Sequence, residues 1–148
     1  MSLNFKIWKQ IMNNNPHNSF PYESLILRNA ILPDILGNDI DAILYWAGRN
    51  LANNFSISTI DDTKAFYKKM HWGQLNIIKQ KKNTEIYKLN GNDVNTRLKL
   101  DSQNNFQIET GFLAQIRQTQ LNCSCEATYE LKNQDIIITC LIDHNFNN

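Results

Sequence analysis

The spacing of the apolar residues changes once along this chain, near Gln74. Before that point, apolar residues recur every three to four positions, which is typical of helices that bury one face. After it, they alternate with polar residues over short runs, which is typical of strands joined by hairpins. A chain of 148 residues has room for one domain. We therefore expect residues 1–148 to form a single α+β domain, an antiparallel sheet of four to five strands covered by N-terminal helices and one inserted helix.

The N-terminal part of the chain predicts two helices. Residues 1–18 have a helical spacing of apolar side chains and are expected to form a loosely packed N-terminal helix. Ser19 and Pro21 are typical of the start of a second helix. Because apolar residues surround most of that helix, we expect it to be central and buried, with an interruption at Pro33 and an end at Gly37.

Two more helices are predicted before Gln74. Residues 40–54 form the clearest apolar stripe at a period of 3.6. Trp46 lies off that stripe, so it either covers another element of the same domain or marks a surface for a partner. Thr59 and Asp62 resemble a capping box and predict a helix over residues 60–70.

The pattern after Gln74 predicts strands, with one helix between them. Leu75, Ile77 and Lys79 are expected to face Leu89, Tyr87 and Glu85 across a hairpin whose loop is residues 81–83. Residues 94–100 alternate and predict a third extended segment. Residues 106–120 predict a helix, and a last hairpin is expected to turn at residues 133–134. On the helix, the isolated Glu109 is expected to face solvent.

Charge and motifs exclude several classes of function. The chain has 15 basic and 14 acidic residues, whereas a nucleic-acid binder concentrates positive charge. No nucleophile motif accompanies the three histidines, so we expect a non-enzymatic protein that needs no cofactor. No apolar run approaches the roughly 20 residues of a transmembrane helix, and no signal peptide is recognisable. We expect a cytoplasmic protein with reduced thiols.

One group of residues offers donors for a metal ion. With a turn at residues 133–134, Cys123 lies opposite His144 and Cys125 lies diagonal to Cys140, all on one face of the hairpin. Two thiolates two positions apart, with a cross-strand Cys and His, could bind Zn²⁺. The same face carries the apolar residues of the hairpin, so core packing of the cysteines is the favoured interpretation.

Four sequence blocks resemble the YslB-like bacterial family of unknown function. They are LPDILG at residues 32–37, ILYWAGRNLA at 43–52, WG at 72–73 and FQIETGFLAQ at 106–115. That family is similar in fold to the 4-vinyl reductase domain, the core subunits of the TRAPP tethering complex and the haem-nitric-oxide domain. The resemblance implies a ligand-binding type of α+β fold that is often dimeric, with an apolar cavity between helices and sheet in some relatives.

Two differences from the fold relatives limit what the resemblance implies about a ligand. The Y-x-S-x-R signature of the haem-binding branch is absent, which disfavours haem. The TRAPP branch acylates a cysteine near the block aligned with residues 106–111, and this chain has no cysteine there.

Three functions remain open from the sequence. The first is a homodimer that binds an apolar, lipid-like small molecule. The second is a protein-interaction or assembly module without a ligand, and the third is a metal- or thiol-dependent protein. The residues expected at a cavity or interface are Trp46, Gly48, Arg49, Trp72, Gly111 and Phe112.

Overall fold

The computed structural model describes residues 21–145, so the predicted helix over residues 1–18 and its neighbour Ser19 lie outside the described part. The helical elements are α2 (Tyr22–Ile26), the π-helical turn η1 (Leu27–Ile31), α3 (Leu32–Leu36), the 3-10 turn η2 (Gly37–Asp39), α4 (Ile40–Ala52), α5 (Ile60–Lys69), α6 (Asn92–Leu100) and α7 (Gln107–Leu121). The strands are β1 (Gln74–Gln80), β2 (Thr84–Asn90), β3 (Ser124–Lys132) and β4 (Asp135–Asp143).

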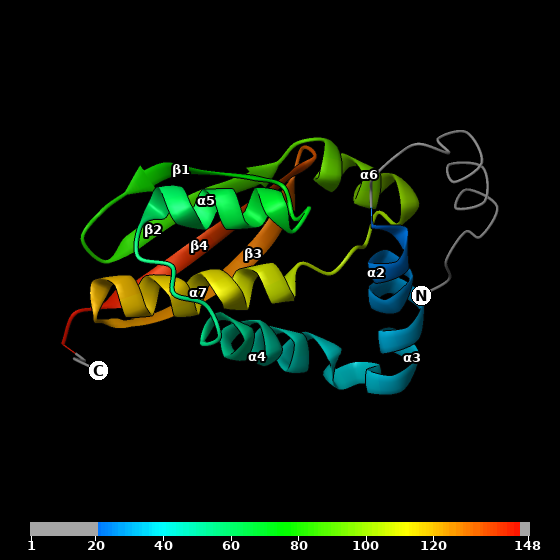
Figure 1. Ribbon diagram of the computed structural model, residues 1–148, viewed down its shortest axis with the longest axis horizontal. Coiled ribbons are helices and arrows are strands. Elements are labelled where there is room, and N and C mark those ends of the chain that lie inside the picture. Colours follow the sequence, from blue (N-terminus) through cyan, green and yellow to red (C-terminus); the bar gives the residue numbers. More distant parts are fainter. Residues whose placement is uncertain (1–20, 146–148) are drawn as a thin grey trace.

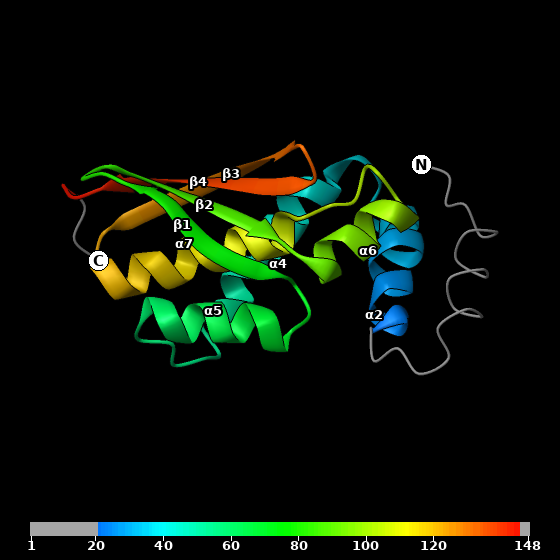
Figure 2. The same ribbon diagram turned by 90° about the horizontal axis from the view of Figure 1, so that it is seen from above.

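The four strands form one antiparallel sheet in the order β1-β2-β4-β3. Helix α7 lies along one face of this sheet, and α4 packs alongside α7, where Tyr45 and Arg49 reach the backbone of β3 (Figures 1 and 2). Helix α5 covers β1 on the same face. The expected α+β architecture with helices over an antiparallel sheet is confirmed.

Local signals placed several boundaries correctly. The helices predicted over residues 40–54 and 60–70 are α4 and α5. The hydroxyl of Thr59 accepts a hydrogen bond from the backbone N–H of Asp62 at 3.1 Å, as a capping residue does. Pro33 stands in the first turn of α3, and Gly37 ends that helix with a φ of 59°. The last hairpin turns at residues 133–134, both with positive φ.

The extended segment predicted over residues 94–100 is wrong, because these residues form helix α6. Val94, Arg97 and Leu98 are buried, and their spacing is that of a helix face. The alternation prediction treated Arg97 as an outward polar residue. Its guanidinium is buried in an ion pair, so the true buried set follows the helical period.

The register of the first hairpin is partly as predicted. Leu75 lies opposite Leu89 and Ile77 opposite Tyr87. The pairing of Lys79 with Glu85 is wrong, because an irregularity between Ile77 and Lys79 shifts the register, so that Lys79 lies opposite Ile86.

The segment α2–η1 is not the central buried helix that its apolar residues suggested. Figure 1 places it at one end of the molecule, beyond the N-terminal end of α7. Leu25 is buried there, but Ile26, Leu27 and Ile31 are each more than a third exposed. One face of the apolar segment α2–η1 therefore packs on the rest of the protein, and its other face is exposed.

Two glycines set the distance between α4 and α7. A Cβ atom on Gly48 would lie 2.2 Å from the carbonyl oxygen of Ile108, and one on Gly111 would lie 2.0 Å from that of Tyr45. These distances are shorter than any van der Waals contact, so only glycine allows the two backbones to approach this closely. Behind this crossing, Phe112 stacks on Phe66 at 4.7 Å between ring centroids and meets the edge of Trp72.

We predict that Gly111→Ala destabilises the protein by about 2 kcal/mol or more, because its methyl group must push α4 away from α7. In an ordinary exposed helix the same change stabilises by up to about 1 kcal/mol. Urea unfolding followed by circular dichroism measures the difference. Asn50→Ala, on the exposed side of α4, is the control and should leave stability unchanged or slightly higher. A stabilised Gly111→Ala variant would contradict the close crossing.

Candidate functional site

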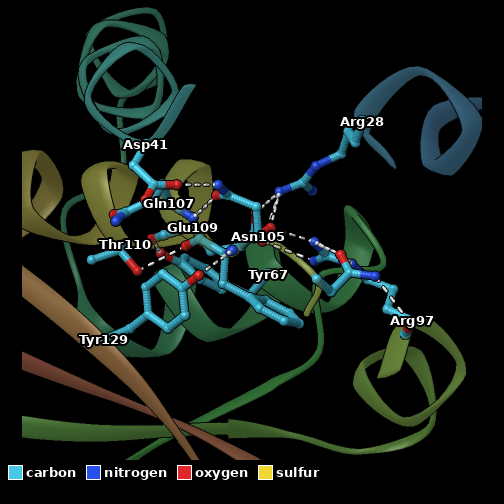
Figure 3. A network of polar contacts seen from close by, with 11 residues as sticks. Arg28, Asp41, Tyr67, Arg97, Asn105, Gln107, Glu109, Thr110 and Tyr129 are labelled. Carbon is cyan, nitrogen blue, oxygen red and sulfur yellow. Dashed lines mark hydrogen bonds and ion pairs between the residues drawn. The ribbon is translucent and has the colours of Figure 1, made fainter. Parts of the chain in front are cut away.

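The carboxylate of Glu109, at the start of α7, is completely buried between two arginines (Figure 3). Arg28 reaches it from η1, and its Nη2 donates to both carboxylate oxygens, with 3.0 Å to Oε2. Arg97 reaches it from α6, with 2.9 Å between Nη1 and Oε2. The expectation that Glu109 faces solvent is therefore wrong. Its partners stand 81 and 12 residues away, so no local spacing reveals them.

Arg97 is held by more than its ion pair. Its Nη2 donates to Oδ1 of Asn104 at 2.8 Å and to the backbone carbonyl of Asn105 at 2.8 Å. Its guanidinium also lies 4.0 Å from the centroid of the Phe106 ring, a cation–π contact. Among side chains, only the planar guanidinium of arginine can make several hydrogen bonds and also stack on an aromatic ring in this way. The loop before α7 thus fixes the position of Arg97.

The charges in this cluster act strongly on one another. Burial by itself would raise the pKa of Glu109, but the charges of Arg28 and Arg97 outweigh it and hold that pKa below its ordinary value. Burial and the neighbouring charge of Arg28 lower the pKa of Arg97 to about 10. Two guanidinium groups against one carboxylate leave these three side chains with one excess positive charge.

A pocket of about 400 Å³ lies beside this cluster, between α2–η1, α4, α6 and the residues that follow α5. Both Arg28 and Arg97 line it. The rest of its wall is mainly apolar and includes Leu25, Leu27, Leu32, Leu51, Trp72 and Ile108. Mostly apolar walls with a few convergent polar groups, at a volume between about 300 and 1,000 Å³, are typical of small-molecule sites.

Two other hollows of similar size lack this combination. One of about 470 Å³ near the end of α7 is lined largely by polar side chains such as Asn53, Ser56 and Gln120. Another of about 460 Å³ lies along α2 and η1 and involves residues of those two elements alone. Neither contains two buried cationic groups, so the pocket beside Arg28 and Arg97 is the candidate site.

The six residues proposed from the sequence are distributed over three places. Trp72 lines the candidate pocket and contacts Phe112, which is completely buried. Gly48 and Gly111 form the helix crossing. A role of these four residues in ligand binding stays a prediction.

Arg49 and Trp46 lie elsewhere on α4. Nη1 of Arg49 donates to the carbonyl of Cys125 at 2.7 Å, and Nη2 donates to Gln118 at 2.8 Å, so this side chain joins α4 to β3 and α7. Trp46 is 65% exposed. Most of its surface is thus not covered by the described part of the chain, and its role at a partner surface stays a prediction.

The cysteines and His144 form two separate pairs. Sγ of Cys123 lies 3.2 Å from Nδ1 of His144, as the predicted hairpin register requires. Cys125 and Cys140 are buried in the core and hydrogen-bonded to each other, which lowers the pKa of Cys125 and raises that of Cys140. Among residues 21–145, no three His, Cys, Asp or Glu side chains are arranged to hold a metal ion.

Comparisons with known proteins agree with this architecture. The structure is an α+β domain, an antiparallel sheet covered by helices. The family described as "Protein of unknown function (DUF2507)" matches residues 20–142, and the chain belongs to that family. The uncharacterized protein YslB of Bacillus subtilis (strain 168) is 32% identical over 117 residues, which are 79% of this chain and 78% of YslB.

Three solved structures resemble the chain at low sequence identity. A vinyl-4-reductase family protein from Methanocaldococcus jannaschii has a TM-score of 0.57 and 14% identity, covering 97% of this chain and 99% of its own. An H-NOX protein from K. algicida has a TM-score of 0.51 and 9% identity, covering 95% and 96%. A trafficking protein particle complex subunit 3 from Naegleria fowleri has 0.48 and 12%, covering 86% and 91%. The first two likenesses show a shared fold.

None of the helices between residues 21 and 145 is long and apolar enough to cross a membrane.

We predict that Glu109→Gln lowers the free energy of unfolding at pH 7 by about 3 kcal/mol, because it leaves two buried guanidinium groups without a charged partner. A lowered pKa stabilises the fold above the ordinary value of 4.5, and this contribution is lost as the pH falls below it. The difference between wild type and variant should therefore narrow in acid. Denaturant titrations at several pH values measure it, with exposed Glu130→Gln as the control. If the difference in unfolding free energy between wild type and Glu109→Gln does not change with pH, the lowered pKa of Glu109 is contradicted.

Proposed function

We propose that this protein is a non-enzymatic binding domain that holds an apolar small molecule in the pocket beside Arg28 and Arg97. The observation that carries the proposal is the pocket itself, about 400 Å³ with leucine, isoleucine and tryptophan side chains in its wall. Transfer of apolar surface from water into such a pocket favours binding by roughly 25 cal/mol per Å² before the costs of association. The resemblance to the YslB-like family and its fold relatives supports the same class of function.

The chemistry of the charged cluster behind the pocket wall supports a binder and not a catalyst. Glu109, the one carboxylate in the cluster, is held between two guanidinium groups and keeps a lowered pKa, so it is a poor general base. Tyr67 donates its hydroxyl hydrogen to the backbone carbonyl of Glu109 at 2.6 Å, and burial raises its pKa well above the ordinary value. These groups serve to fix α7 against α5 and α6.

The pocket predicts binding of N-phenyl-1-naphthylamine, an uncharged apolar fluorophore whose emission rises in apolar surroundings. Met70→Trp places an indole at a partly exposed position of the pocket wall, so we expect it to weaken the binding of this probe about tenfold or more. The control is Ile78→Trp, which adds the same side chain at an exposed position of β1 outside the pocket. Equal binding of the probe by the wild type and both variants would contradict this pocket as the site.

A second candidate function rests on a different surface. The elements η1, α3 and α4 carry large apolar side chains that are exposed, namely Ile31, Ile35, Ile43 and Trp46. Ile43 and Trp46 are three positions apart and share one side of α4. Exposed apolar surface with a tryptophan is typical of protein interfaces. The occupant that we propose for this surface is a second copy of the chain, which would make the protein a homodimer.

We expect Trp46→Glu to convert the homodimer to a monomer, because a carboxylate on the apolar surface would lose its hydration in the interface. Analytical ultracentrifugation over a dilution series measures the change in association. Leu141→Glu introduces the same charge at an exposed leucine of β4 and should leave the dimer intact. A wild-type protein that sediments as a monomer at every concentration would refute the dimer.

A further inference from the structure

The charged side chains that line the candidate pocket in the described part of the chain are basic. Within residues 21–145, the pocket lining includes four basic side chains, those of Arg28, Lys69, His71 and Arg97, and no acidic one. The acidic groups that face these residues lie behind the wall. They are Glu109, which binds both arginines, and Asp93, which lies 3.4 Å from Nδ1 of His71. An apolar cavity with this wall favours a ligand that carries negative charge.

In the buried cluster of Arg28, Arg97 and Glu109, the positive charge exceeds the negative charge. Two guanidinium groups meet one carboxylate, and the side chains of Arg28, Arg97 and Glu109 are 14%, 3% and 0% exposed. Within the cluster each arginine is repelled by the other, which is one reason why the pKa of Arg97 is lowered. A buried charge without a partner is costly, so one further anion at this point would stabilise the cluster.

Arg28 has a donor available for such an anion. All of its hydrogen bonds, to Glu109 and to the carbonyl of Asn105, use Nη2. Its Nε is buried and has no hydrogen-bond partner in the described part of the chain. A buried N–H without an acceptor destabilises the free protein. Nη1 of Arg28 is not buried and makes no hydrogen bond within residues 21–145, so a ligand oxygen in the pocket can reach Arg28 at Nη1.

We propose that the pocket binds an amphipathic monoanion, an apolar chain that ends in a single carboxylate, with the carboxylate directed to Arg28 and Arg97. The inference rests on the proposed function and adds the charge and the end group of the ligand. A carboxylate carries one negative charge and matches the single excess charge of the cluster. A phosphate monoester carries between about −1.5 and −2 at pH 7 and exceeds it.

The test compares four ligands that share a twelve-carbon chain, namely dodecanoate, dodecanol, dodecyl phosphate and dodecyltrimethylammonium. Each displaces N-phenyl-1-naphthylamine from the wild-type full chain, at concentrations below micelle formation. We expect dodecanoate to bind about tenfold tighter than dodecanol, since hydrogen bonds to a charged group are worth about 1.5 kcal/mol or more. Dodecyl phosphate should bind more weakly than dodecanoate, and the ammonium compound should bind most weakly.

Two variants assign the effect to the arginine. Arg28→Gln should reduce the affinity for dodecanoate to that for dodecanol while the affinity for dodecanol stays unchanged. Lys68→Gln removes a positive charge from an exposed residue of α5 outside the pocket wall and should change neither affinity. Thermal unfolding shows whether Arg28→Gln is folded. If it is not, the four-ligand comparison on the wild type decides.

The outcomes separate the two proposals. If none of the four compounds binds, the proposed function fails and the charge preference fails with it. If dodecanol binds as tightly as dodecanoate, the pocket is an apolar site and only the monoanion inference is overturned. Tighter binding of dodecyl phosphate or of the ammonium compound overturns it as well.

Discussion

The buried carboxylate of Glu109 is the interaction on which this end of the molecule depends. It joins η1, α6 and α7 through two arginines that come from distant parts of the chain. A buried ion pair adds little net stability over an apolar core of the same shape, but loss of one member is costly. The cluster therefore acts chiefly to specify which helices meet here. As a consequence, a cationic wall faces a pocket between those helices.

The approach of α4 to α7 is a second constraint, and it is purely steric. Gly48 and Gly111 let the backbones touch, which places Phe112 in the aromatic layer against Phe66 and Trp72. Arg49 then spans the two helices and reaches the carbonyl of Cys125 on β3. The same packing leaves the outer side of α4 uncovered, where Trp46 stands. Helix α4 is thus packed on one side and carries the exposed Trp46 on the other.

Elements whose partners are close in sequence were predicted well. Hairpin turns, the Thr59 cap and the stripe of α4 depend on contacts within a few residues, and local physics decides them. The two failures at the candidate site share one cause. Glu109 was expected in solvent and Arg97 in an alternating extended segment, because an isolated charge normally stays in water. Their mutual burial turned a predicted strand into α6 and a predicted surface residue into the centre of the candidate site.

The sequence by itself determined the fold class, the positions of most helices and strands, and the apolar residues available for a core, because these follow from periodicity and from caps and turns. Trp72, Phe112, Gly48 and Gly111 were expected at a cavity or an interface, and their burial at the helix crossing and in the aromatic layer came from the structure. Only the tertiary structure decided that two arginines share one carboxylate beside a pocket, and that Trp46 stays exposed. Such pairings join residues up to 81 positions apart, and no local pattern encodes a contact over that separation.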